Sequence, residues 1–178
     1  MAAVTFNHRL LWNNGFDASS LAAASQDLSD LLGFLRDKAG SLRIDSGRIC
    51  LMAFSAGGPL LTETIVRPSD SVRCIVGFYP YLGPPLTLTN EPSRFSALDS
   101  LRSAGKLPPM FIAKAGRDQP TLNASIDAFV DQAKTRDVDV RLIEHPEGVH
   151  GFDIWNDDDT SREIIRQAVQ FMRKYLSR

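Results

Sequence analysis

The stretch that decides the fold reads Arg48-Ile-Cys-Leu-Met-Ala-Phe-Ser-Ala-Gly-Gly58. Its short apolar run over 49–54 predicts a buried strand, and the pattern over 60–66 predicts a helix. Ser55 lies where the strand turns into the helix. A serine at such a turn sits on a tight, strained bend that pushes its Oγ out of the sheet, which is what a catalytic nucleophile needs.

Small residues surround this serine. Ala53, Gly57 and Gly58 allow the strand and the helix to cross closely. The backbone amide of Ala56, at the start of the helix, points to where a developing oxyanion would sit. The same residues also fit a serine that only caps a helix after a core strand, so the turn alone leaves both interpretations open.

Strand-like and helix-like patterns alternate along the rest of the chain. Helical spacing of apolar residues predicts helices over 25–38, 59–67, 122–136 and 160–176, with a weak one over 95–104. Strands are expected over 4–11, 49–54, 72–79, 110–115 and 138–144, and a proline-rich loop over 81–92. This alternation predicts an α/β fold, a three-layer sandwich with a mostly parallel sheet of about five strands, in one domain over 1–178.

Composition indicates an ordinary soluble globular protein. The chain has 178 residues, 43% of them hydrophobic and 23% charged, which is enough for one domain with its own core. The net charge of -1 gives no reason to expect a nucleic acid or an anionic membrane as a partner. The sequence has no cluster of cysteine and histidine with metal-ligand spacing.

The cysteines and the N-terminus favour a cytoplasmic protein. Cys50 and Cys74 both lie inside apolar strand-like runs, so we expect buried free thiols in a reducing compartment rather than a disulfide. The first residues lack the basic region and apolar core of a signal peptide. No run is long enough to span a bilayer.

Three reactive side chains follow three of the predicted strands. Ser55 follows the strand over 49–54, Asp118 the strand over 110–115, and His150 the strand over 138–144. Ligands of such sheets bind at the carboxyl ends of the strands. A serine hydroxyl needs a histidine to take its proton, and a carboxylate to hold that histidine in the right tautomer. We therefore predict a catalytic triad.

Each of these residues also has an ordinary explanation. Asp118 alone could be a turn aspartate, and His150 alone a loop histidine. Their order along the chain and their common place at strand ends favour the triad. His8 and His145 lie outside the pattern, and Asp45 and Asp99 fit turns or helix caps.

Three motifs carry a family resemblance that covers nearly the whole chain. Phe54-Ser-Ala-Gly-Gly58, Ala115-Gly-Arg-Asp-Gln-Pro120 and Gly148-Val-His-Gly-Phe-Asp153 resemble an α/β-hydrolase of the dienelactone hydrolase and esterase type. Phe6-Asn-His-Arg-Leu10 resembles that fold's fourth strand and the turn after it. The resemblance implies ester hydrolysis without a cofactor, with Ser55 as nucleophile, His150 as base and then acid, Asp118 as orienting acid and the Ala56 amide as one oxyanion donor.

The resemblance fails at the front of the chain. Such hydrolases carry about three further strands before the one expected here over 4–11, and the loop after the third supplies the second oxyanion donor, often from a His-Gly-Gly-Gly type motif. The sequence contains neither. We therefore expect the chain to be either a natural short form of such a hydrolase or a fragment of a longer gene product.

This departure leads us to expect a partner. A doubly wound sheet needs helices on both faces, and the resembled fold implies that the helix over 160–176 would cover one face nearly alone. One helix is about 10 Å wide, whereas five strands at roughly 4.8 Å spacing span twice that. We expect apolar side chains near Val4 and Phe6 to be uncovered, and either a homo-oligomer or an N-terminal segment from elsewhere to cover them.

Three functional hypotheses remain at this point. The first is a serine ester hydrolase that acts on small acyl esters through an acyl-enzyme. The second is a non-catalytic binding protein of the same fold that lacks a complete oxyanion hole, and the third is a serine peptidase. The acyl and alcohol preferences are not encoded in any motif, because the pocket walls come partly from loops such as 81–92.

Overall fold

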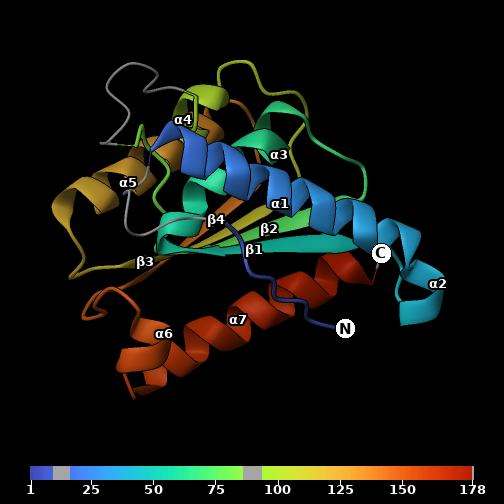
Figure 1. Cartoon of the computed structure of the whole chain (residues 1–178). Coiled ribbons are helices and arrows are strands. Elements are labelled where there is room, and N and C mark those ends of the chain that lie inside the picture. The colour runs from blue at the N-terminus through green and yellow to red at the C-terminus, as the bar shows by residue number, and fades with distance from the viewer. Residues whose placement is uncertain (10–16, 86–93, 178) are drawn as a thin grey trace.

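A computed structural model of the chain describes residues 1–9, 17–85 and 94–177. Within these ranges a parallel sheet of four strands forms the centre, in the order β1-β2-β3-β4. The strands are β1 (Ile49–Phe54), β2 (Val72–Phe78), β3 (Met110–Ala115) and β4 (Val140–His145). Helices cover both faces, so the molecule has three layers, as Figure 1 shows. The predicted α/β class and layer arrangement are therefore confirmed.

The helices divide unequally between the two faces. One face carries α1 (Ala18–Asp37), α3 (Thr62–Val66), α4 (Ala97–Ser100) and α5 (Pro120–Lys134), and the other carries α6 (Phe152–Trp155) and α7 (Asp159–Leu176) (Figure 1). Two short elements complete the described chain, α2 (Ala39–Leu42) and the 3-10 helix η2 (Ser55–Leu61). Because each strand ends at the same edge of a parallel sheet, the loops after β1, β3 and β4 meet there.

Helix α7 contacts all four strands of the sheet. It buries Ile164, Ala168 and Phe171 against them, and its other side is charged. Its N-cap is Asp158, whose side chain accepts a hydrogen bond from the amide of Ser161. The expected helix over 160–176 thus forms and covers its face of the sheet.

The strand predicted over 4–11 does not form in the described part of the chain, so the sheet has four strands rather than about five. Residues 4–9 have no regular structure and are mostly exposed, and residues 10 and 11 lie outside the described ranges. Arg9 instead binds α1, with its amide 2.6 Å and its Nε 2.8 Å from the carboxylate of Asp27. This polar attachment to a helix replaces the pairing with a strand that the local pattern predicts.

Other boundaries differ from prediction for local reasons. Helix α1 begins at Ala18 instead of residue 25, because Asp17 caps it by accepting the amide of Ser20 at 2.7 Å. The weak helix over 95–104 shrinks to α4, which Ser96 caps. The proline-rich loop predicted over 81–92 lies mainly outside the described residues, since 86–93 are not among them.

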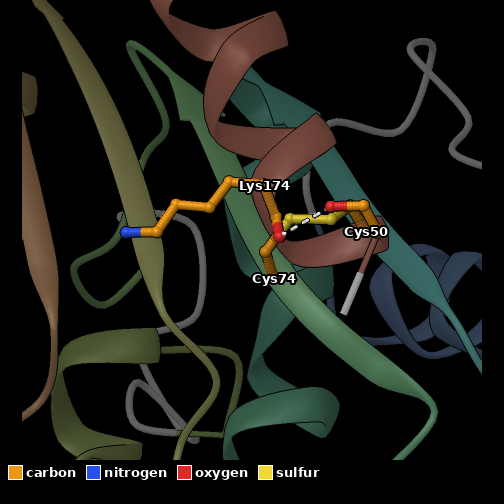
Figure 2. The surroundings of a disulfide bond; sticks show 4 residues. Cys50, Cys74 and Lys174 are labelled. Atoms are coloured by element: carbon orange, nitrogen blue, oxygen red, sulfur yellow. Dashed lines mark hydrogen bonds between the residues drawn. A yellow bond between two sulfur atoms is a disulfide. The ribbon is translucent and has the colours of Figure 1, made fainter.

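The expectation of free thiols was wrong, because Cys50 and Cys74 form a disulfide. The register pairs these two residues directly across β1 and β2, with 4.6 Å between their Cα atoms. Such a separation lies within the range that a disulfide spans. Figure 2 shows the bond beneath the part of α7 that carries Lys174, whose side chain extends away from it. A strand pattern gives no register, so the sequence could not show that the two sulfurs meet.

This disulfide leads to a prediction about stability. It closes a loop with a sequence separation of 24 residues, and a cross-link of that length is expected to stabilise the fold by ~3 kcal/mol through the unfolded chain. Urea unfolding of the wild type and of a Cys50→Ala, Cys74→Ala double variant should show this difference. Equal unfolding midpoints, with equal denaturant slopes, would show that the bond contributes nothing to stability.

Candidate active site

Ser55 has the backbone conformation of a strained turn. It follows β1 directly and begins η2, and its φ is +49°, in the left-handed region that non-glycine residues rarely adopt. A conformation of this kind costs of order 1–3 kcal/mol and persists only where the surroundings enforce it. The turn lifts the serine hydroxyl off the end of the strand, as the sequence predicts.

The close approach that the small residues allow is greatest at Gly58. A Cβ on Gly58 would lie 2.8 Å from the amide nitrogen of Tyr81, so only glycine fits there. Tyr81 belongs to the chain after β2, and its amide donates to the Ser55 carbonyl at 2.9 Å. At Gly57 a Cβ would meet only Ala53, at an ordinary 3.6 Å. The tight crossing therefore lies between η2 and the segment after β2, and it holds the Ser55 turn in place.

His150 connects the other two predicted residues. Its Nε2 lies 2.7 Å from the Ser55 Oγ, and its Nδ1 lies 2.6 Å from Oδ2 of Asp118. The Asp118 side chain is only 1% exposed, whereas the His150 side chain is 44% exposed. A carboxylate accepts and cannot donate, so Nδ1 carries the proton and Nε2 is free to accept the serine proton. The structure thus brings all three residues together in a continuous hydrogen-bonded chain.

The turn that carries Asp118 is attached to the loop that carries His150. Asp118 accepts the amide of Gln119 at 2.7 Å, which fixes its second oxygen. The amide of Arg117 donates to the Gly148 carbonyl at 2.9 Å, and the Arg117 side chain pairs with Glu147. The backbone contact orients the two loops, while the exposed ion pair contributes little by itself.

Tyr79 is a residue of the site that sequence reasoning missed. It follows β2 with a φ of +38°, and its ring lies 4.7 Å from the His150 ring, measured between centroids. Its hydroxyl donates to Asp153, and burial together with that carboxylate raises the pKa of Tyr79 well above its usual value. The phenol therefore stays protonated at neutral pH. Tyr79 directly follows β2, and parallel strands end at the same edge of the sheet as the loops that carry Ser55, Asp118 and His150. Its place after a strand could therefore have indicated its role.

The remaining candidates lie where the sequence suggested. Ala56 is the second residue of η2, and the amides of a helix's first turn have no partner within the helix. His145 does not touch the three residues above; it is buried and binds Asp158. Asp45 forms a turn by accepting the amide of Gly47 at 2.9 Å, and Asp99 lies in the first turn of α4. His8 is exposed beside Phe6.

Over 1–9, 17–85 and 94–177 no group of three or more histidine, cysteine, aspartate or glutamate side chains could hold a metal ion. In the same part of the chain, no helix combines the length and the apolar character needed to cross a membrane.

A family model decides the relationship of this chain. The model described as "Dienelactone hydrolase family" matches residues 15–176. The chain belongs to the dienelactone hydrolase family. The match includes all three motifs that resemble the family, and it places the protein among hydrolases of the α/β-hydrolase fold. A comparison with curated proteins found no match.

Solved structures with this fold include esterase 2 of Thermogutta terrifontis. Its form phosphoramylated by tabun has a TM-score of 0.73 and 22% identity, with 89% of this chain and 67% of that chain covered. The propionate-bound form has a TM-score of 0.74 and 22% identity, with 89% of this chain and 68% of that chain covered. The form phosphorylated by paraoxon has a TM-score of 0.74 and 23% identity, with 89% of this chain and 66% of that chain covered. The present chain therefore shares the fold of these esterase structures, and it covers about two thirds of their length.

Proposed function

We propose that this protein is a serine ester hydrolase that acts on small acyl esters through an acyl-enzyme. The observation that carries the proposal is the hydrogen-bonded chain from the Ser55 Oγ through His150 to the buried Asp118, with separations of 2.7 and 2.6 Å. The strained φ of Ser55 supports it, because strain at one residue is typical of a functional position. Membership in a hydrolase family supports the reaction class.

The mechanism follows from the roles that this geometry permits. The Ser55 Oγ attacks the acyl carbon while Nε2 of His150 takes its proton, and Asp118 stabilises the imidazolium that forms. The amide of Ala56 donates to the developing oxyanion. His150 then gives its proton to the departing alcohol. A water molecule, activated by the same histidine, attacks the acyl-enzyme and releases the acid.

A fluorophosphonate probe tests whether the triad is assembled. Esterase 2 of Thermogutta terrifontis has been solved phosphonylated by sarin and phosphorylated by paraoxon, which makes an organophosphorus reagent a suitable choice. We expect the probe to label Ser55 and to abolish turnover of short acyl esters. A folded protein that is not labelled would favour the alternative of a non-catalytic binding protein.

The choice between an esterase and a peptidase needs a second measurement. An ester has a better leaving group than an amide, and the mechanism above needs no further residue to expel it. We therefore expect turnover of short acyl esters and little turnover of peptides with the same acyl group. Faster peptide cleavage would favour the serine peptidase.

We also propose that the protein associates through the edge of β1 that faces away from β2, where no strand of the described residues pairs. The Ile49 amide donates to Ser71 beside β2, so the alternate backbone groups of β1, from Cys50 onward, point away from β2. Met52 and Phe54 on this strand are 42% and 41% exposed. An edge strand with exposed apolar side chains is a template for another strand. The proposed occupant is a second copy or an N-terminal segment from elsewhere, which could also provide the second oxyanion donor.

Dilution tests this association. Light scattering across a concentration series should show a mass above that of the monomer. The esterase rate per chain should fall as the protein is diluted, because dissociation removes the partner that provides the second oxyanion donor. In Phe54→Lys, the rise in mass and the rise in esterase rate per chain should both need a higher protein concentration than in the wild type. A stable monomer with undiminished activity at the lowest concentration would exclude the proposal.

A further inference from the structure

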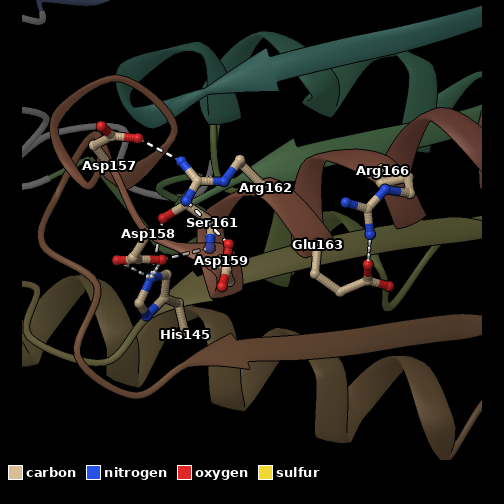
Figure 3. A network of polar contacts seen from close by, with 8 residues as sticks. All are labelled: His145, Asp157, Asp158, Asp159, Ser161, Arg162, Glu163 and Arg166. Carbon is tan, nitrogen blue, oxygen red and sulfur yellow. Dashed lines mark hydrogen bonds and ion pairs between the residues drawn. The ribbon is translucent and has the colours of Figure 1, made fainter.

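The loop between β4 and α7 carries His150, and one part-buried side-chain contact joins its two ends. His145, the last residue of β4, is 2% exposed. Its Nε2 lies 3.1 and 3.2 Å from the two carboxylate oxygens of Asp158 and 3.0 Å from the Oγ of Ser161 (Figure 3). Asp158 and Ser161 belong to the start of α7. The contact between His145 and Asp158 therefore joins the two residues that flank the segment 146–157.

The His145 ring also supports the loop from below. A Cβ on Gly148 would lie 2.7 Å from Cγ of this ring, so the loop backbone passes directly over it. On another side the ring packs against Phe152, with 5.1 Å between centroids. Phe152 packs against Tyr79 at 5.7 Å, and Tyr79 against His150 at 4.7 Å. Packed rings thus connect His145 continuously to His150.

The backbone of His145 joins the same loop to the turn that carries Asp118. Its carbonyl accepts the amide of Gly116 at 2.8 Å and the amide of Gly148 at 3.0 Å. Gly116 precedes Asp118 by two residues, and Gly148 precedes His150 by two. A displacement of His145 would therefore move both partners of the 2.6 Å hydrogen bond between Asp118 and His150.

The contact between His145 and Asp158 is directional. Nε2 faces a carboxylate, which can only accept, so this nitrogen carries the ring proton. Nδ1 is buried and has no hydrogen-bond partner in the described part of the chain, so Nε2 is the ring nitrogen that makes the polar contacts. The Ser161 amide is the largest cause that lowers the pKa of Asp158, to about 2, so its carboxylate remains a charged acceptor at neutral pH. The ion pairs of Arg162 and Arg166 beside it in Figure 3 are exposed.

We propose that His145 and Asp158 are positioning residues, which hold the loop 146–151 so that His150 stays between Ser55 and Asp118. The proposal rests on the proposed hydrolase, since it assigns these two residues a part in the geometry of that site. They touch no substrate. Their contact sets the orientation of His150, and a misplacement of about 1 Å at a catalytic group can lower a rate by roughly 100-fold.

Two pairs of variants separate this role from simple stability. His145→Phe keeps a ring of similar shape and removes the donor to Asp158, whereas His145→Gln keeps a donor near the place of Nε2. Asp158→Ser keeps a good N-cap for α7 but is too short to reach His145, whereas Asp158→Asn keeps both the cap and the acceptor. Ile65→Val shortens a buried side chain of α3 and serves as a control for lost stability.

For His145→Phe and Asp158→Ser we expect kcat on a short acyl ester to fall about 10- to 100-fold, with KM within about twofold of the wild type. Asp158→Asn and His145→Gln should recover most of this loss, and Ile65→Val should lose none. The nitrogen NMR shifts of the His150 ring, assigned by comparison with His150→Ala, should change from a single Nδ1–H tautomer to a mixture in His145→Phe and Asp158→Ser.

Unchanged kcat and unchanged His150 shifts in the two disruptive variants would overturn the proposal. So would an equal loss in Asp158→Asn and Asp158→Ser, since the acceptor would then not matter. If His145→Phe fails to fold, Asp158→Ser decides. If the wild type turns over no ester, the proposed function fails, and the His150 shifts alone still decide whether His145 and Asp158 position the loop.

Discussion

Ser55→Ala is expected to lower kcat on short acyl esters by about four or more orders of magnitude. The Oγ that would form the acyl-enzyme is the atom 2.7 Å from Nε2 of His150, and nothing else in that contact can replace it. The variant should fold normally, because the hydroxyl lies at the end of the strand and not in the core. Steady-state rates at matched concentrations, together with circular dichroism, measure both expectations.

A matched control separates the loss of the nucleophile from the loss of any serine. Ser41 lies in α2, is exposed, and donates only to the carbonyl of Lys38. Ser41→Ala should therefore keep wild-type turnover and wild-type labelling by a fluorophosphonate. The assignment of Ser55 would be wrong if the folded wild type were no faster than Ser55→Ala.

Asp118→Asn is expected to lower kcat by about four orders of magnitude as well. The carboxylate is 1% exposed and is the acceptor that fixes the proton on Nδ1 of His150. An amide in its place can donate to Nδ1 and so favour the tautomer in which Nε2 cannot accept the serine proton. His150→Ala should cost at least as much, because it removes the base itself.

The combination with Ser55→Ala tests whether the three residues act as a unit. Double variants with Asp118→Asn or His150→Ala should be hardly slower than Ser55→Ala alone, far from the product of the single effects. Asp45→Asn is the matched control, since this carboxylate holds an exposed turn and does not contact His150. Turnover of Asp118→Asn within about twofold of the wild type would make Asp118 a turn residue and another carboxylate the acid.

Local patterns predicted most of the elements well. The mostly apolar runs that became β1 and β3 were predicted with the bounds that the structure has, since short apolar runs between turn residues are typical of buried parallel strands. The amphipathic spacing before the C-terminus predicted α7 to within one residue. These patterns are reliable because each strand or helix must bury its apolar side chains, whichever elements it packs against.

The pattern over 4–11 shows where this reasoning fails. A strand exists only when its backbone pairs with a neighbour, and the local sequence does not state whether a neighbour is available. In the described part of this segment, Arg9 binds Asp27 and no pairing with β1 forms. The same gap explains the disulfide, because the pairing of Cys50 with Cys74 depends on register between strands.

The sequence by itself determined the class of the fold and the three residues of the candidate site. Ser55, Asp118 and His150 each follow a predicted strand, and parallel strands must end at a common edge, so their meeting could be inferred without coordinates. Tertiary structure alone decided what surrounds them. Tyr79 against His150, and His145 beneath the loop, depend on ring packing across several elements, and contacts of that kind follow from side-chain positions in space and not from any spacing along the chain.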